Sequence, residues 1–278
     1  MEKSIAIIGG GGRLGSWFRR FFEAEGFEVT VVEFDDGQKK EDIADKNKYI
    51  LFATPHRVTP ELIGQWGSLL TSDHVLVDLS SVKTFTAIAC SRVSAESLLI
   101  HPMWSPQVTS MTGQALVVCG TPKIGTKSAS LLQIFEAAGA RLTYTNPDEH
   151  DQIMSMIQVV SHASLLAIGL AHKRSQLPLD TLLHSESPVY RMISAMVGRM
   201  LSHQADLYAD IATLNPYGAE GIRMLSEAVS EIELMIRNND SEGYAKLFTS
   251  AQAHRASSIP EAVRDSAAMI EALVKHDR

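Results

Sequence analysis

The sequence has few cysteines, no excess of basic residues and no long apolar run. Two of its 278 residues are cysteines, Cys90 and Cys119, and they do not form a C-x-x-C pair. This spacing excludes a disulfide framework and a cysteine-based zinc site, and it favours a reducing, cytoplasmic environment. A net charge of −7 disfavours nucleic acid as a partner, because neutralising phosphates requires a basic surface.

Signals for membranes and metals are also scarce. No run of consecutive apolar residues approaches the about twenty that span a bilayer, and the N-terminus reads as a strand rather than a cleavable signal. The ten histidines do not cluster at metal-ligand spacing. We therefore expect no membrane partner and no metal. With 45% hydrophobic residues, the chain is long enough for two domains with cores.

Glycine is concentrated near the N-terminus, where residues 4–8 read as an apolar strand and a G-x-G-x-x-G motif follows. We expect Gly10 to make the tight turn, Gly12 to let backbone N–H groups approach a pyrophosphate, and Gly15 to let helix and strand pack closely. Apolar residues then recur at helical spacing, so a helix N-terminus would point at the phosphates. These features predict a dinucleotide site.

An acidic residue after the second strand indicates which dinucleotide. The strand expected over residues 28–32 ends at Glu33, about where a carboxylate accepts the ribose hydroxyls of NAD and repels the 2′-phosphate of NADP. Asp35 and Asp36 are close enough to share this role. The predicted NAD-binding residues are Gly10, Gly12, Arg13, Leu14, Gly15, Glu33, Thr54 and Pro55.

The pattern along the chain changes once. Short β-rich runs alternate with helical patterns up to Asn146, which is typical of a doubly wound parallel sheet, whereas helical periodicity dominates from Pro147 onward. The predicted fold is α/β, with an N-terminal Rossmann-type domain over residues 1–146 and an all-α domain over residues 147–278. Beyond the first two strands, we expect strands at residues 49–53, 74–78, 98–100, 115–119 and 141–144.

Residues with chemical potential follow three of these strands. His56 comes after the strand at 49–53, Ser81 and Lys83 come after the strand at 74–78, and His101 comes after the strand at 98–100. Ligands of open α/β sheets bind outside the carboxyl ends of the strands. We therefore expect these side chains to converge beside the nicotinamide.

Several further motifs can be read together with these, and the later ones lie outside the nucleotide fold. They are VDLSSVK at 77–83, HPM at 101–103, GARL at 139–142, EHDQ at 149–152, SPVYR at 187–191, AMVGR at 195–199 and LYADI at 207–211. With the glycine motif, they resemble the prephenate dehydrogenases of tyrosine biosynthesis, most closely the enteric type. The resemblance covers nearly the whole chain and implies the dehydrogenase part, without the chorismate mutase that is fused to it elsewhere.

The resemblance implies oxidative decarboxylation of prephenate to 4-hydroxyphenylpyruvate, with hydride passing from ring carbon C4 to NAD. His101 corresponds to the catalytic histidine of the family, and an imidazole of ordinary pKa about 6.5 suits a base near neutrality. Ser81 corresponds to a serine that touches the same hydroxyl, and His56 to a histidine near nicotinamide and substrate. Lys83 could face a substrate carboxylate or be a solvated lysine at the start of the next helix.

Helical angles in the second domain separate two arginines. Apolar residues between Val189 and Met200 form one stripe, with Arg199 at its edge and Arg191 on the opposite side. Arg199 can reach inward, its planar fork suits a substrate carboxylate, and it matches the substrate-binding arginine of the family. We assign Arg191 to a surface or subunit contact. Members of the family form dimers through this domain, so we expect a homodimer.

The helix expected over residues 148–173 carries a narrow polar stripe. Gln158 and His162 belong to it, and we assign both to the wall of the substrate pocket, with a solvent-facing stripe as the alternative. His162 has a family counterpart at that pocket. Ser105 is the main departure, because the family usually has glycine there, and a side chain beside the base alters the pocket next to C4.

The departure at Ser105 leaves the substrate open between prephenate, 4-amino-4-deoxyprephenate and arogenate. A hypothesis of another class is an NAD-responsive regulator without turnover, but such a sensor needs neither His101, Ser81 nor Arg199. A β-hydroxyacid dehydrogenase also joins this nucleotide fold to a helical domain. Its base is a lysine in that domain, and nothing around Lys173 recommends it over His101.

Overall fold

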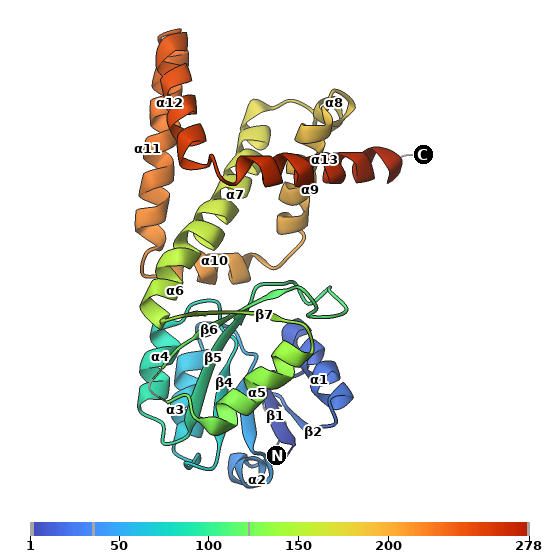
Figure 1. Cartoon of the computed structure of the whole chain (residues 1–278), viewed down its shortest axis with the longest axis vertical. Helices are drawn as coiled ribbons and strands as arrows, with labels where there is room; N and C mark the ends of the chain where they lie inside the picture. The colour runs from blue at the N-terminus through green and yellow to red at the C-terminus, as the bar shows by residue number, and fades with distance from the viewer. Residues whose placement is uncertain (1–2, 35–36, 122, 277–278) are drawn as a thin grey trace. The chain divides into compact units, whose positions relative to one another are not determined.

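A computed structural model of the protein describes residues 3–34, 37–121 and 123–276 (Figure 1). Contacts divide the chain into two units. The first, which we call the sheet unit, comprises Met1–Met154 and Asp210–Pro216; the second, the helical unit, comprises Ser155–Ala209 and Tyr217–Arg278. The contact boundary at Met154 lies beyond the predicted one at Asn146, because the first turns of the following helix pack with the sheet.

Seven strands form one sheet in the order β2-β1-β3-β4-β5-β6-β7. Neighbouring strands are parallel except for β5 and β6, which pair antiparallel, so the expected all-parallel sheet is wrong at this edge. The predicted Rossmann-type α/β fold is confirmed. The strands are β1 Ser4–Ile8, β2 Glu28–Val32, β3 Tyr49–Phe52, β4 Val75–Asp78, β5 Glu96–Pro102, β6 Ala115–Cys119 and β7 Arg141–Thr145.

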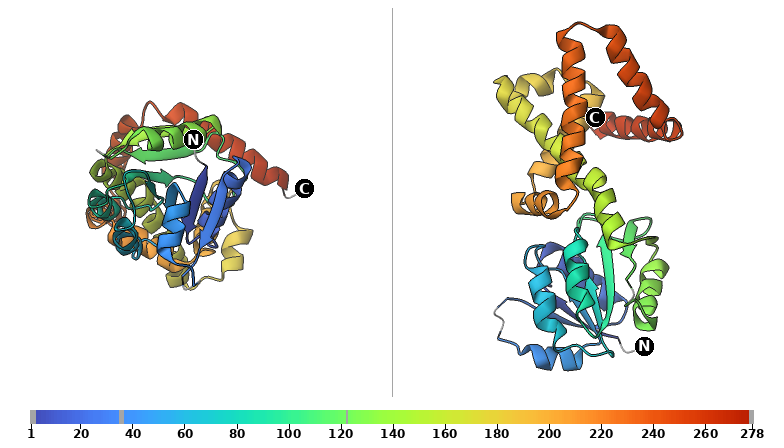
Figure 2. Two further views of the ribbon diagram at one scale, coloured as in Figure 1. Left: turned by 90° about the horizontal axis from the view of Figure 1, so that it is seen from below. Right: turned by 90° about the vertical axis from the view of Figure 1, so that its left-hand side faces the viewer.

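Helices cover both faces of this sheet (Figure 2). Ile5 and Ile7 of β1 pack in one cluster with side chains of α1 and α5, while Ala6 and Ile8 pack in a second cluster with side chains of α2, α3 and α4. Burial on both faces explains why the central strands are continuous apolar runs. The helices are α1 Arg13–Ala24, α2 Lys40–Lys46, α3 Thr59–Gly67, α4 Thr84–Ser91 and α5 Thr126–Ala137.

Strand β5 is longer than the sequence predicts. It extends to Pro102 because antiparallel pairing with β6 places His101 opposite Val117. His101 is therefore the penultimate residue of a buried strand instead of the first residue of a loop. Pairing with β6 therefore holds the backbone of His101 on one side, and a loop residue would lack this support.

The chain after β7 is helical, as predicted. Helix α6 belongs to the sheet unit, a π-helical turn follows it, and α10 begins in the helical unit and ends in the sheet unit. Gly221 lets α11 approach the π turn, because a Cβ there would lie 3.1 Å from Val160 Cγ2. The elements are α6 Pro147–Met154, η1 Ser155–Val160, α7 Ser161–Ser175, α8 Leu179–His184, α9 Pro188–Leu201, α10 Ala205–Leu214, α11 Gly218–Arg237, α12 Ser241–His254 and α13 Ile259–His276.

The run α6–η1–α7 is one continuous helix from Pro147 to Ser175, and its most apolar window has a mean hydropathy of 1.7. By length and composition it could cross a membrane, although polar residues interrupt its apolar sequence, and our expectation of no membrane partner stays a prediction. One such helix is weak evidence for a span, because core helices pass the same test. Only 17% of that window is buried within the chain.

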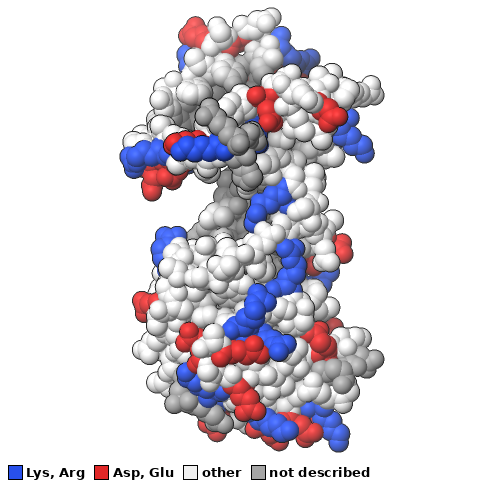
Figure 3. Space-filling view, turned by 90° about the vertical axis from the view of Figure 1, so that its right-hand side faces the viewer, with Lys and Arg blue, Asp and Glu red and all other residues white. Residues whose placement is uncertain are grey.

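Charged side chains of both signs are interspersed on the face shown in Figure 3. In the helical unit many of them pair along one helix, as Arg223 does with Glu220 and Glu227 on α11. Such exposed pairs contribute little to stability.

Candidate active site

The glycine-rich loop joins β1 to α1, and Gly9 makes its tight turn. Gly9 has a φ of +79° and donates its N–H to Val32 O at 2.8 Å. A Cβ at this position would lie 2.9 Å from Ala53 O. The N–H of Gly12 donates to Gly9 O at 3.1 Å, so the tight turn runs from Gly9 to Gly12 and contains Gly10, the glycine to which the sequence assigns it.

The other motif glycines occupy positions that exclude any side chain. A Cβ on Gly15 would lie 2.3 Å from Gly9 O and 2.8 Å from Gly10 Cα, so helix and loop could not approach as they do. Gly12 is the N-cap of α1, and no side chain caps this helix terminus. The first-turn residues Arg13 and Leu14 therefore present backbone N–H groups at the helix N-terminus, which suits an anion such as a pyrophosphate.

Glu33 lies beside this loop, as predicted. Its carboxylate accepts the N–H of Gly11, and a Cβ on Gly11 would lie 2.8 Å from Glu33 Oε1. Thr54 borders the loop from β3, since a Cβ on Gly9 would lie 3.2 Å from Thr54 Cγ2; exposed Pro55 follows it. The alternative acids Asp35 and Asp36 lie outside the described residues.

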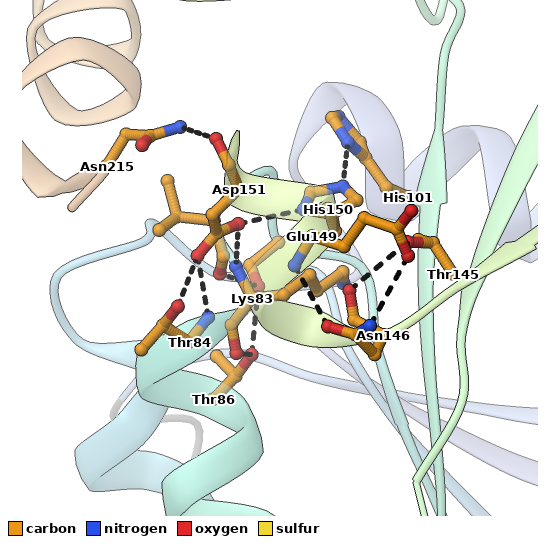
Figure 4. Close-up of polar contacts among 12 residues, drawn as sticks. Lys83, Thr84, Thr86, His101, Thr145, Asn146, Glu149, His150, Asp151 and Asn215 are labelled. Atoms are coloured by element: carbon orange, nitrogen blue, oxygen red, sulfur yellow. Dashed lines mark hydrogen bonds and ion pairs between the residues drawn. The ribbon is translucent and has the colours of Figure 1, made fainter. Parts of the chain in front are cut away.

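A chain of buried hydrogen bonds contains His101 (Figure 4). His101 Nδ1 lies 2.9 Å from His150 Nε2, and His150 Nδ1 lies 2.8 Å from Asp151 Oδ1. Their exposed fractions are 3% for His101 and 0% for His150 and Asp151. Two histidines and one carboxylate from β5 and α6 thus form a connected network inside the sheet unit.

Asp151 connects this network to the start of α4. Its Oδ1 accepts the backbone N–H of Lys83 at 2.8 Å, and its Oδ2 accepts the N–H of Thr84 at 2.8 Å and the Thr84 hydroxyl at 2.7 Å. The carbonyl of Asp151 accepts the Asn215 side-chain amide at 2.8 Å. A buried carboxylate with this many donors is stabilised in its ionised form.

Lys83 is buried and does not fit a substrate-binding role. Its ammonium donates to Asp78 Oδ2 at 2.6 Å, to Ile100 O at 2.7 Å and to Asp78 O at 3.2 Å. These three acceptors match its three donors, and its side chain has no exposed surface. Both readings from the sequence, a ligand for a substrate carboxylate and a solvated lysine, are therefore corrected to a buried ion pair.

Burial sets the protonation of the two histidines. Burial, together with the nearby positive charges of His150, Lys83 and His56, lowers the pKa of His101 well below 6.5. Burial also lowers the pKa of His150, against the opposing hydrogen bond to Asp151. Burial alone would raise the pKa of Asp151, but hydrogen bonds from His150, Lys83 and Thr84 outweigh it and lower that pKa. Near neutral pH the network therefore holds neutral imidazoles and one carboxylate.

His56, Ser81 and His101 lie at one edge of the sheet, as predicted, because β3, β4 and β5 are adjacent and parallel. Ser81 is partly buried in the loop between β4 and α4, and Ser105 is partly buried after β5. The two ring nitrogens of His56 are shielded from solvent without a hydrogen-bond partner among the described residues, and burial lowers its pKa. His56 also lines a cavity of about 480 Å³ with Phe85 and other residues.

The helical unit holds the other predicted substrate contacts. His162 packs edge-on against Tyr208 at 4.7 Å between ring centroids, and burial lowers its pKa. Gln158 is partly buried in the π turn η1, and Arg199 on α9 is exposed. The polar stripe predicted from a 3.6-residue period crosses this π turn, so its members do not follow one straight face. The roles of Gln158, His162 and Arg199 stay predictions.

Sequence reasoning missed the two positioning candidates of the sheet unit. From the sequence, His150 and Asp151 are named only within the EHDQ motif at 149–152 and are not placed beside His101. The signal was present in the EHDQ segment, where two adjacent polar residues enter a helix that also carries apolar ones. Nothing in the sequence indicated which strand they would meet.

Comparison with known proteins gives a consistent result. The family described as "Prephenate dehydrogenase, dimerization domain" matches residues 146–250. The "T-protein" of Haemophilus influenzae is 32% identical over 245 residues, which cover 88% of this chain and 65% of that protein. The chain thus spans slightly less than two thirds of that relative. A 4-amino-4-deoxyprephenate dehydrogenase of Streptomyces pristinaespiralis is 21% identical over 261 residues, or 87% and 88% of the two chains.

A solved structure shares the fold. The crystal structure of prephenate dehydrogenase from Aquifex aeolicus in complex with hydroxyphenyl propionate and NAD+ superimposes with a TM-score of 0.69. The match covers 92% of this chain and 98% of that chain at 17% sequence identity. It therefore supports the combination of a Rossmann-type sheet with the helical region that follows.

Proposed function

The chain belongs to the prephenate dehydrogenase family, and on that premise we propose that it catalyses the NAD-dependent oxidative decarboxylation of prephenate to 4-hydroxyphenylpyruvate. The observation that carries this proposal is the buried, neutral His101 at the carboxyl edge of the sheet, on the same edge as the glycine loop. An imidazole in that state is a base ready to accept a proton near neutral pH.

The glycine loop fits the cofactor. Gly12 and the first turn of α1 would hold the pyrophosphate, and Gly15 leaves the close approach that a side chain would fill. Glu33 would accept the ribose hydroxyls. When bound, NAD supplies the hydride acceptor. Replacing Glu33 by alanine is expected to weaken the discrimination against NADP, measured as the ratio of kcat/KM with the two cofactors; an unchanged ratio would move this role to Asp35 or Asp36.

The residues of the chain then divide the work. His101 accepts the proton of the C4 hydroxyl while hydride leaves C4 for the cofactor. The ring carboxylate then departs as CO2, the ring becomes aromatic, and the proton returns from His101 to the phenolate oxygen. Ser81 orients the same hydroxyl. Arg199 binds a substrate carboxylate, and His162 and Gln158 line the pocket around it.

Substrate choice is tested directly with prephenate, arogenate and 4-amino-4-deoxyprephenate. We expect NADH formation with the highest kcat/KM on prephenate. A clear preference for an amino-bearing ring would keep the chemistry and replace the substrate, and S105G is then expected to change the preference because Ser105 follows the strand that carries His101. If the protein binds NAD but turns over none of the three compounds, the proposed dehydrogenase activity is contradicted and the hypothesis of an NAD-responsive regulator is favoured.

We also propose a homodimer formed through the helical unit. Apolar side chains on α9, such as Ile193 and Met196, are exposed, and this region matches a dimerization domain. Light scattering is expected to give twice the 30.4 kDa chain mass, and M196E is expected to shift it toward the monomer. The expectations about nucleic acid, membrane and a cytoplasmic location stay predictions.

A further inference from the structure

We propose that His150 and Asp151 are positioning residues that hold His101 in the tautomer with its proton on Nδ1, so that Nε2 carries the lone pair that accepts the substrate proton. This inference rests on the proposed function only in its last step, the use of Nε2 as a base. The tautomer itself follows from the hydrogen-bond chain, and it can be measured without turnover.

The argument begins at the carboxylate. Asp151 accepts hydrogen bonds and donates none when ionised, so the 2.8 Å contact between its Oδ1 and His150 Nδ1 requires the proton on His150 Nδ1. The backbone N–H groups of Lys83 and Thr84 and the Thr84 hydroxyl already point at this carboxylate. A protonated Asp151 would oppose them, so the ionised form is strongly favoured.

The next link is the contact between the two imidazoles. A neutral His150 that carries its proton on Nδ1 has an unprotonated Nε2, which can only accept. His101 Nδ1 lies 2.9 Å from that atom, so it must donate. A neutral His101 that donates from Nδ1 then has its lone pair on Nε2. The order of donors and acceptors is thus determined from Asp151 outward.

The alternative order requires a costly charge state. If His150 donated to His101 through Nε2, it would need a proton on Nδ1 as well, because two acceptors 2.8 Å apart repel each other. That imidazolium would lie fully buried near the ammonium of Lys83, and both burial and this charge oppose it. The neutral relay avoids the extra buried positive charge.

The same network also fixes the backbone of the base. Lys83 donates its backbone N–H to Asp151 and its ammonium to Ile100 O at 2.7 Å, one residue before His101. The ring of His101 is thus held through His150, and its strand is held through Lys83. Both connections end at the start of α4, directly after the loop that carries Ser81. One carboxylate therefore connects the base, its partner histidine and the Ser81 loop.

The test uses two variants of His150 that differ in one property. H150Q keeps an acceptor near the former Nε2, whereas H150M has a similar length and no oxygen or nitrogen acceptor. We expect H150M to lower kcat by about 10²-fold with KM and NAD affinity near normal, and H150Q to recover to within about tenfold of the wild type. The matched control is H254Q, which replaces an exposed histidine on α12 and should leave kcat unchanged.

The decisive readout is the tautomer itself. Nitrogen-15 NMR of histidine-labelled protein distinguishes protonated from unprotonated ring nitrogens, and we expect His101 with its proton on Nδ1 in the wild type. D151N should disturb this state. An amide can donate to His150 Nδ1, which would reverse the direction of the hydrogen bonds between residue 151, His150 and His101. If the wild type carries the proton on Nε2 of His101, or if H150M changes neither tautomer nor kcat, the proposal is overturned.

These readouts separate the relay from the reaction. A protein that shows the expected tautomers but turns over none of the three substrates would support the relay and contradict the proposed function. A protein that turns over prephenate with the opposite tautomer would support the reaction and overturn the relay. Thermal unfolding of each variant shows whether a loss of kcat reflects a loss of fold.

Discussion

The two units differ in how they bury their apolar side chains. In the sheet unit, β1, β3 and β4 are buried at every position, and two clusters fill the space on either side of the sheet. In the helical unit, α7, α8 and α12 contain no buried residue. The sheet unit therefore buries its apolar side chains in its own core, whereas the helical unit leaves many of its apolar side chains exposed.

This difference separates two parts of the chemistry. The hydrogen bonds that lead from Asp151 through His150 to His101 all join residues of the sheet unit. Arg199 and His162 belong to the helical unit, in which many apolar side chains are exposed. We therefore expect changes near His101 to affect the rate constant, and changes in the helical unit to affect substrate affinity and assembly.

The largest effect is expected at the base. H101Q should lower kcat by about 10²–10⁴-fold, because it removes the proton acceptor while keeping a polar side chain of similar size. NAD affinity, measured by calorimetry, should stay near normal, since the glycine loop is a separate part of the unit. A normal kcat in this variant would show that another residue is the base, and it would contradict the assignment of the rate constant to residues near His101.

The next effect concerns stability. K83M leaves Asp78 buried without its ion-pair partner and should lower the free energy of unfolding by about 3–5 kcal/mol. The tryptophans Trp17, Trp66 and Trp104 all lie in the sheet unit, so their fluorescence follows this unit alone. R19M, which breaks the exposed Arg19–Glu23 pair on α1 of the same unit, is the matched control and should cause no measurable change. Equal effects of the two substitutions would contradict the difference between a buried and an exposed ion pair.

A third prediction concerns substrate binding in the helical unit. R199A should raise KM for the substrate, with a loss of about 2–5 kcal/mol of binding if the carboxylate pair is buried in the complex. Steady-state kinetics at saturating NAD measure this directly, and R191A serves as the control on the same helix. A loss of NAD binding in R199A would show that Arg199 serves the cofactor instead.

The smallest effect is the dependence of stability on pH. Burial lowers the pKa of His56, His101 and His150 in the folded sheet unit, so the unfolded chain binds more protons as the pH falls. Their contribution is complete above the unfolded value of 6.5 and is lost as the pH falls below it. Urea midpoints from tryptophan fluorescence should decrease from pH 7.5 to 5.5, whereas a flat profile would mean that these histidines are protonated in the folded state.

Much of the sheet unit could be predicted from the sequence. The strands at 4–8, 28–32 and 115–119 match the structure at both ends, because apolar runs bounded by turn residues have one simple interpretation. The dinucleotide loop was also placed correctly. The left-handed φ of Gly9, just before the predicted turn glycine, could not be predicted, because it depends on the close approach of Ala53 from another strand.

The details of the site depend on contacts that a linear pattern does not contain. Lys83 looks like a surface residue, because its partners Asp78 and Ile100 lie on two different strands. His150 and Asp151 meet β5 only after the sheet has formed. The polar stripe predicted for the long helix does not form one straight face, because a constant period of 3.6 residues does not account for a π turn.

That π turn has a consequence for how the chain tolerates insertions and deletions. Bonds from residue i to i+5 in Ser155–Val160 accommodate one more residue than an α-helical turn would. Deleting a single residue there would restore regular winding and rotate every downstream side chain by about 100° relative to α6. His162 would then point to another sector of the helix. The length of this short segment therefore sets the side of the helix from which His162 projects, about three turns after Asp151.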